Sequence, residues 1–348
     1  MKEIYNKLNY YLNDICNYLE RENSFLLENI KSICILNDKF LENIENYDLD
    51  NETTQNNLTY EDVYLLAREV IENIDSSYLK DFDNLIQSGE LDFSFERTYN
   101  DSECISMYKN DQLLKQIINI NREFNYNDVM LLVHEFIHYT NGKKDSINRH
   151  YLTEFLSIYF ELYTVDYLLK KEINKTEIDY LFRIKNIKQH CNIFFQYEIV
   201  LLAYIKFGNL DDNTVKLLQK YLLNIKKEIF EKECSALYKK LSKIEEKNRN
   251  IINEDSKVIV RILSEEFMTK NYRYILGTFL AIYTQKYGNF NDIVYLNNHI
   301  NEYDNKSIYD ICLSIGIDFK DKDFQEKLFI AIDEYISNKQ FDNKKLVI

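Results

Sequence analysis

The sequence contains no proline and no tryptophan, and only 6 of its 348 residues are glycine. Proline normally makes up about 5% of a chain, and it interrupts helices because it lacks the N–H donor and clashes with the preceding turn. The residues that β-sandwiches and doubly wound α/β folds place between their strands are therefore nearly missing. Codon bias also explains such a composition, but its physical consequence is the same. We expect a mostly α protein.

Positive charge is also scarce, because 43 Lys and Arg residues stand against 57 Asp and Glu, for a net charge of −14. A chain this acidic is a poor candidate for binding nucleic acid through its phosphates or for binding an anionic lipid surface. No apolar stretch reaches the length of about 18 residues that a membrane-spanning helix needs. The first residues also lack the apolar core of a secretion signal. We expect neither nucleic acid nor a membrane as a partner.

Closely spaced cysteines are missing as well. The six cysteines lie far apart and include no C-x-x-C pair. This spacing suits neither a zinc cage nor a disulfide framework. It is typical of reduced thiols, and we therefore expect a cytoplasmic protein.

Apolar residues recur at three- and four-residue spacing along most of the chain, as in amphipathic helices. A polar stretch at residues 48–57 interrupts this pattern and is the best candidate for a linker. It separates an N-terminal helical segment, residues 1–58, from one larger domain, residues 59–348. Apolar and polar residues alternate only within residues 91–121, where we expect two or three short strands, the last at Gln116–Asn121.

The helix predicted for residues 128–141 contains His134-Glu135-Phe-Ile-His138, which matches the H-E-x-x-H pattern. Residues four apart lie on one helix face, so both imidazoles can reach a single metal ion. Glu135 stands beside them, where a carboxylate can take a proton from water. Two histidines satisfied by core neighbours are the plain alternative, but burying two His and a Glu is costly without a function. We predict a metal site that holds one zinc ion.

A catalytic zinc ion needs a third protein ligand and one open position. The next predicted helix, residues 151–171, carries Glu154 and Glu161, which are two turns apart and share a face. The glutamate nearer the metal would be the ligand, and the other would orient a ligand imidazole. A histidine pair with a glutamate from a following helix defines the gluzincin arrangement. These residues by themselves leave the choice between Glu154 and Glu161 open.

The stretch from His134 to Glu161 resembles the oligoendopeptidase F branch of the thimet oligopeptidase family of zinc metallopeptidases. In that family a glutamate opens an E-[IV]-A-S-x-x-x-E-like sequence after the zinc helix, and Glu154-Phe-Leu-Ser-x-x-x-Glu161 is similar to it. The similarity covers roughly residues 60–340, with a shortened N-terminal region. By this context Glu154 would be the third zinc ligand, with Glu161 as the alternative.

The resemblance implies a zincin-like helical metallopeptidase fold with a small β-sheet that edges the active-site cleft. It also implies hydrolysis of peptide bonds, with Glu135 as the general base. The sequence Tyr272-Arg-Tyr274 is similar to a tyrosine-rich stretch of the family, so Tyr272 or Tyr274 would donate a hydrogen bond to the oxyanion. The strand Gln116–Asn121 would pair with the backbone of the peptide substrate.

Two other functions fit the same residues. Ser264 stands near the position where the family has a substrate-binding histidine, which suggests an inactive relative that binds peptides as a module. The shortened N-terminal region would admit larger substrates, which suggests a processing protease dedicated to one partner. The intact His134, Glu135 and His138 favour an active zinc endopeptidase or oligopeptidase, and this is the function that we predict.

Overall fold

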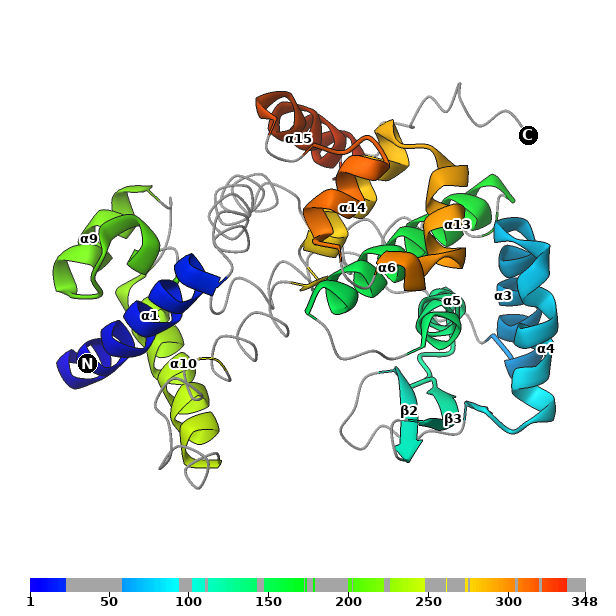
Figure 1. Cartoon of the computed structure of the whole chain (residues 1–348), viewed down its shortest axis with the longest axis horizontal. Coiled ribbons are helices and arrows are strands. Elements are labelled where there is room, and N and C mark those ends of the chain that lie inside the picture. Colours follow the sequence, from blue (N-terminus) through cyan, green and yellow to red (C-terminus); the bar gives the residue numbers. More distant parts are fainter. Residues whose placement is uncertain are drawn as a thin grey trace. The chain divides into compact units, whose positions relative to one another are not determined.

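The structure is a computed structural model of the whole chain. It describes residues 1–22, 58–93, 102–109, 112–142, 147–171, 173, 178, 200–201, 203–221, 226–247, 261, 273–274, 276–303, 306–318 and 321–336. These residues are mostly helical and include one three-stranded sheet, which confirms the predicted mostly α class (Figure 1). The expected linker at residues 48–57 lies outside the described residues.

Contacts divide the chain into two compact units. The first comprises residues 1–48 and 188–275, and the second comprises residues 49–187 and 276–348. We expected residues 59–348 to form one domain, whereas part of that range belongs to the unit that contains the N-terminal helix. The physical reason is a pair of matching apolar stripes on two helices that are distant in sequence.

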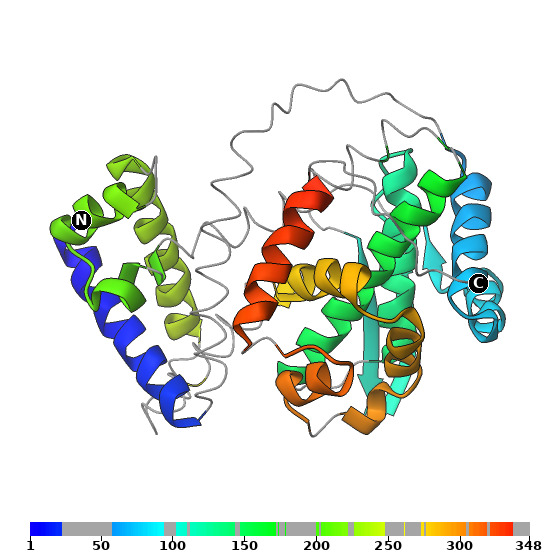
Figure 2. The ribbon, with the colours of Figure 1, turned by 90° about the horizontal axis from the view of Figure 1, so that it is seen from above.

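Those two helices are α1 (Lys2–Glu22) and α10 (Lys227–Lys247), which lie side by side in the first unit (Figure 2). Each buries one stripe at helical spacing, namely Tyr5, Leu8, Leu12 and Ile15 on α1, and Phe230, Cys234, Leu237 and Leu241 on α10. Each stripe packs against the other, so α1 and α10 share one small core. A shorter helix, α9 (Asp212–Tyr221), belongs to the same unit.

The second unit contains the sheet and most of the described helices. In chain order its elements are α3 (Tyr60–Ile74), η1 (Ser76–Tyr78), α4 (Leu79–Gln87), β1 (Leu91–Asp92), β2 (Glu103–Lys109), β3 (Gln112–Asn119), α5 (Tyr126–Asn141), α6 (Ile147–Lys170), α13 (Phe290–Asn298), η3 (Ile300–Tyr303), α14 (Ile308–Ser314) and α15 (Lys322–Ile336). Helix α5 packs against α6, against α3 and against strands β2 and β3. It is therefore the central element of this unit.

The sheet has the strand order β1-β3-β2. Ile118 of β3 pairs in parallel with Leu91 of β1 on one side and antiparallel with Cys104 of β2 on the other. Ile118 and Ile120 are fully buried, and β2 and β3 pack against α5. In the described part of the chain, β2 forms one edge of the sheet.

Local chemistry explains where α5 begins and ends. The side chain of Asn125 accepts a hydrogen bond from the Asn127 backbone N–H at 2.9 Å, which caps the first turn. Gly142 follows the last residue with a φ of 60°, a left-handed conformation that favours glycine. The predicted helix, residues 128–141 ending at Gly142, is thus confirmed with two additional residues at its start.

Phe136 anchors α5 in the core, and we expect Phe136→Ala to lower the free energy of unfolding by about 3–5 kcal/mol. Its side chain is fully buried, and its ring centroid lies 5.0 Å from that of Phe82 in an edge-to-face contact. Leu65→Ala on α3 is the matched control, because Leu65 is 50% exposed. This substitution should change the free energy of unfolding by about 0.5 kcal/mol or less. Urea denaturation measures both variants. Equal effects of the two substitutions would contradict the packing described here.

Candidate metal centre

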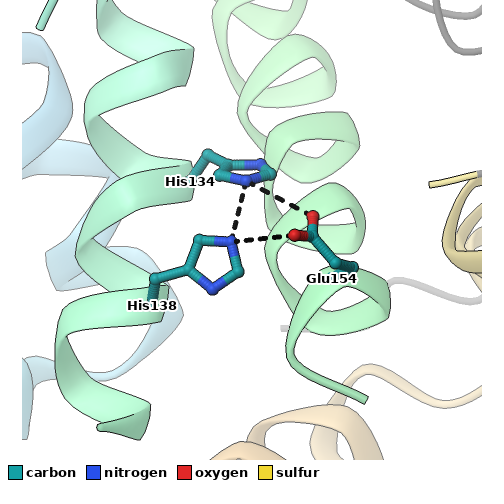
Figure 3. Close-up of side chains that lie close together, drawn as sticks. All are labelled: His134, His138 and Glu154. Carbon is teal, nitrogen blue, oxygen red and sulfur yellow. Dashed lines mark hydrogen bonds and ion pairs between the residues drawn. The ribbon is translucent and has the colours of Figure 1, made fainter. Parts of the chain in front are cut away.

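The two histidines of the H-E-x-x-H sequence lie one turn apart on α5 and point to the same place. Their Nε2 atoms are 3.0 Å apart, and their ring centroids are separated by 4.7 Å. His134 is buried and His138 is partly exposed, with 20% of its side chain accessible. The helical spacing predicted this shared face, and the prediction is confirmed (Figure 3).

Glu154 reaches the same place from α6. One carboxylate oxygen lies 3.8 Å from Nε2 of His134, and the other lies 3.8 Å from Nε2 of His138 (Figure 3). The potential ligand atoms of these three residues all lie within 4.8 Å of one another. Glu154 is only 3% exposed, so its charge is held away from bulk water. Two imidazoles and a carboxylate thus form a buried cluster that can hold a metal ion.

Glu161 occupies a different place in the same group. Its carboxylate oxygen lies 3.0 Å from Nδ1 of His134, the nitrogen on the far side of the ring from the cluster. Glu161 is also buried, with 4% exposure. A carboxylate at this position orients a ligand imidazole and fixes which nitrogen carries the proton. The two glutamates share a face of α6 but lie on different sides of the His134 ring. Sequence spacing alone could not show which of them is nearer the cluster.

Glu135 lies beside the histidines and contacts the sheet. Its carboxylate accepts a hydrogen bond from the backbone N–H of Cys104 in β2, and the residue is only 6% exposed. Burial raises the pKa of the Glu135 carboxyl above its ordinary value, although both neighbouring histidines act in the opposite direction. The contact with β2 was not foreseen, because a backbone N–H carries no signal in the sequence.

Helix α6 is also approached closely by the helical residues 276–287. A Cβ atom on Gly277 would lie 3.2 Å from the backbone nitrogen of Phe155 and 3.3 Å from the carbonyl carbon of Glu154. These distances are shorter than most contacts of a real Cβ atom. Glycine at this position therefore lets the helix backbone approach the turn of α6 that carries Glu154.

The donor set of the cluster fits zinc. Catalytic zinc sites use three protein ligands drawn from histidine and acidic residues, and they keep one position open. Neutral imidazole nitrogens suit zinc, copper, iron and nickel better than they suit calcium or magnesium, which prefer oxygen ligands. His134, His138 and Glu154 provide such a set, and Glu161 provides the outer carboxylate that usually accompanies it.

Metal binding should displace a proton from His134. Burial lowers the pKa of this imidazole, but the carboxylates of Glu161, Glu135 and Glu154 outweigh burial and raise the pKa to about 9. The metal-free imidazole is therefore protonated at pH 7.5, and a metal ligand must be neutral. We expect zinc binding at pH 7.5 to release about one proton from this residue. Calorimetric titration in buffers of different ionisation enthalpy measures the release, and a binding enthalpy that is independent of the buffer would contradict the expectation.

Neither candidate tyrosine belongs to the described part of the unit that contains this cluster. Tyr272 lies outside them. Tyr274 belongs to the first unit, where its hydroxyl accepts a hydrogen bond from Nη2 of Arg273 at 2.7 Å, whereas the histidine pair belongs to the second unit. The role of either tyrosine as an oxyanion donor stays a prediction.

Part of the strand that we expect to pair with substrate, Gln116–Asn121, already has a neighbouring strand on both sides. Ile118 and Asn119 are flanked on both sides, by β1 and by β2, so their backbone groups are already paired within the sheet. In the described sheet, the edge next to Glu135 is formed by β2 instead. A short β-branched run predicted a strand here, but the order of the strands depends on long-range pairing.

Comparisons with models of known protein families, with curated proteins and with solved structures found no match. The resemblance to the thimet oligopeptidase family therefore stays a prediction from sequence motifs. Among the described helices, none is long and apolar enough to cross a membrane.

Proposed function

We propose that the protein is a zinc-dependent endopeptidase or oligopeptidase of the gluzincin type. One observation carries this proposal, namely that His134, His138 and Glu154 form a buried cluster with the Glu135 carboxylate beside it. His134, His138 and Glu154 would hold the metal, and Glu135 would remain free of it. The three proposed ligands and Glu135 place four ionisable residues in one small volume. Burying such a group is costly unless it has a function.

Zinc bound at the cluster would supply a Lewis acid that lowers the pKa of water toward about 7 and polarises a carbonyl oxygen. Glu135 would take a proton from the attacking water as the water oxygen bonds to the peptide carbonyl carbon. It would then give this proton to the leaving amine nitrogen, the C–N bond would break, and a carboxylate and an amine would be released. In the metal-free protein, burial raises the pKa of Glu135, so its carboxylate binds a proton more strongly than that of an exposed glutamate.

Glu161 would act on the histidine rather than on the substrate. By accepting a hydrogen bond from Nδ1 of His134, it would keep the proton on that nitrogen and leave Nε2 available as a ligand. This assignment supports Glu154 as the third ligand, because each glutamate then has one position and one task.

The proposal also includes a zincin-like fold and a peptide that lies along the sheet. Strand β2 forms one edge of the described sheet, and its Cys104 N–H contacts the general base. A peptide added to this edge would bring its backbone next to Glu135. Backbone pairing tolerates different side chains, which suits an enzyme that cleaves varied peptides.

Peptide cleavage mapped by mass spectrometry tests this function. The purified full chain is incubated with a mixed library of peptides and small proteins, before and after treatment with a chelator and after zinc is restored. We expect cleavage that disappears with the chelator and returns with zinc. Cleavage of a single library member would favour the dedicated processing protease. Bound zinc without any cleavage would favour the inactive peptide-binding module and overturn the proposal.

A further inference from the structure

Arg149 is a buried cation in the first turn of α6. The N-terminus of a helix carries partial positive charge, so a cation is disfavoured there. Arg149 is nevertheless only 3% exposed. Burying a guanidinium is costly unless hydrogen bonds compensate, so the hydrogen bonds of Arg149 indicate what the residue does.

The guanidinium reaches back to the end of the preceding helix. Its Nη2 donates to the backbone carbonyl oxygen of Asn141, the last residue of α5, at 2.5 Å. The C-terminus of a helix carries partial negative charge and leaves its last carbonyls without helical partners. The same nitrogen lies 3.4 Å from the side-chain oxygen of Asn301 in η3. Arg149 thus joins the start of α6 to the end of α5 with a charge-assisted hydrogen bond.

Asn141 is itself held by other elements of the unit. Its side-chain amide donates to the Asn297 side chain at 3.0 Å, and Asn297 in turn donates to the Tyr78 hydroxyl at 2.5 Å. Asn141 and Asn297 are both at least nine-tenths buried. The end of α5 is therefore fixed to α13 and to η1, and Arg149 ties α6 to that fixed point.

The position of this contact relative to the ligands gives it a function. His138 lies one turn before Asn141 on α5, and Glu154 lies five residues after Arg149 on α6. The metal cluster needs the ligand atoms of two separate helices to stay within a few tenths of an ångström of a fixed arrangement. We propose that Arg149 is a positioning residue that sets the separation of His138 from Glu154, and so the metal affinity of the cluster. This inference rests on the metal site of the proposed function.

Zinc affinity of the full-length protein tests the inference, measured by competition with a chromophoric chelator. We expect Arg149→Ala to weaken zinc binding about 10- to 100-fold, as outer residues of metal sites do. Arg149→Lys keeps the charge and one set of donors but loses the planar fork of the guanidinium. The zinc affinity of this variant should therefore lie between those of the wild type and Arg149→Ala. The visible absorption of bound Co²⁺, which reports coordination geometry, should also change in Arg149→Ala.

Arg122, which precedes the start of α5, offers a matched control. It is also buried, at 7% exposure, and its Nη2 donates to the backbone carbonyl oxygen of Leu58 at 2.8 Å. Its Nε lies 3.7 Å from a carboxylate oxygen of Asp128 in α5, so Arg122 joins the start of α5 to the residue before the N-cap of α3. Arg122→Ala should lower stability in urea like Arg149→Ala, yet leave zinc affinity within about threefold and the Co²⁺ spectrum unchanged.

The outcomes separate this inference from the proposed function. If the wild-type chain binds no zinc, the metal site itself is wrong. If the wild type binds zinc and the Arg149 and Arg122 variants lose the same affinity, Arg149 contributes only stability and the inference is overturned. If Arg149→Ala does not fold, Arg149→Lys decides, because wild-type affinity and an unchanged Co²⁺ spectrum in that variant would overturn it.

Discussion

Replacing Glu135 with glutamine should lower kcat for peptide cleavage by about 10²- to 10⁴-fold, the usual contribution of a general base. Glutamine has nearly the same shape but cannot take a proton from water. Zinc should remain bound, because the proposed ligands are His134, His138 and Glu154. Steady-state cleavage of a peptide identified in the library measures the rate, and zinc content measured on the same preparation confirms that the metal site is intact.

Glu72→Gln is the matched control for this substitution. Glu72 lies on α3 with about half of its side chain exposed, so the same chemical change there should leave cleavage unchanged. A Glu135→Gln variant that cleaves at the wild-type rate would show that Glu135 is not the base. A rate lowered only through lost zinc would give Glu135 a role in binding the metal.

The second large effect concerns the two glutamates of α6. Glu154→Ala should weaken zinc binding by more than about 100-fold, because it removes a direct ligand, whereas Glu161→Ala should weaken it by about 10- to 100-fold, as loss of an outer carboxylate does. The reason is geometric, since Glu154 lies 3.8 Å from both Nε2 atoms and Glu161 lies on the Nδ1 side of His134. Competition with a chelator measures both constants.

The order of these two losses decides between the alternatives that the sequence left open. A larger loss for Glu161→Ala would make Glu161 the third ligand. Equal and small losses would mean that neither glutamate binds the metal. Glu334→Ala on α15 is a suitable control, because its carboxylate pairs with Lys286 and it takes no part in the cluster.

Local periodicity predicted the parts of the site that lie on single helices. The four-residue spacing placed His134 and His138 on one face of α5, and the seven-residue spacing placed Glu154 and Glu161 on one face of α6. Gly142 ends α5 where its left-handed preference predicts. These features depend on residues no more than about two turns apart, so the sequence contains enough information to predict them.

Long-range packing determines the features that were missed. The pairing of α1 with α10 joins residues more than 200 positions apart, and no pattern in either helix names its partner. The position of β3 between β1 and β2 is equally non-local. Arg149 reads as an ordinary charged residue in the sequence, and only its burial and its contact with Asn141 distinguish it.

The most direct measurement of the central claim is a crystal structure of the zinc-loaded protein, with anomalous scattering recorded on both sides of the zinc absorption edge. We predict one strong peak, bonded to Nε2 of His134 and His138 and to a Glu154 oxygen, at about 2.0–2.2 Å from each atom. Nδ1 of His134 should still face Glu161. No peak among these residues, or a zinc ion bound elsewhere in the chain, would contradict the claim that they form a zinc centre.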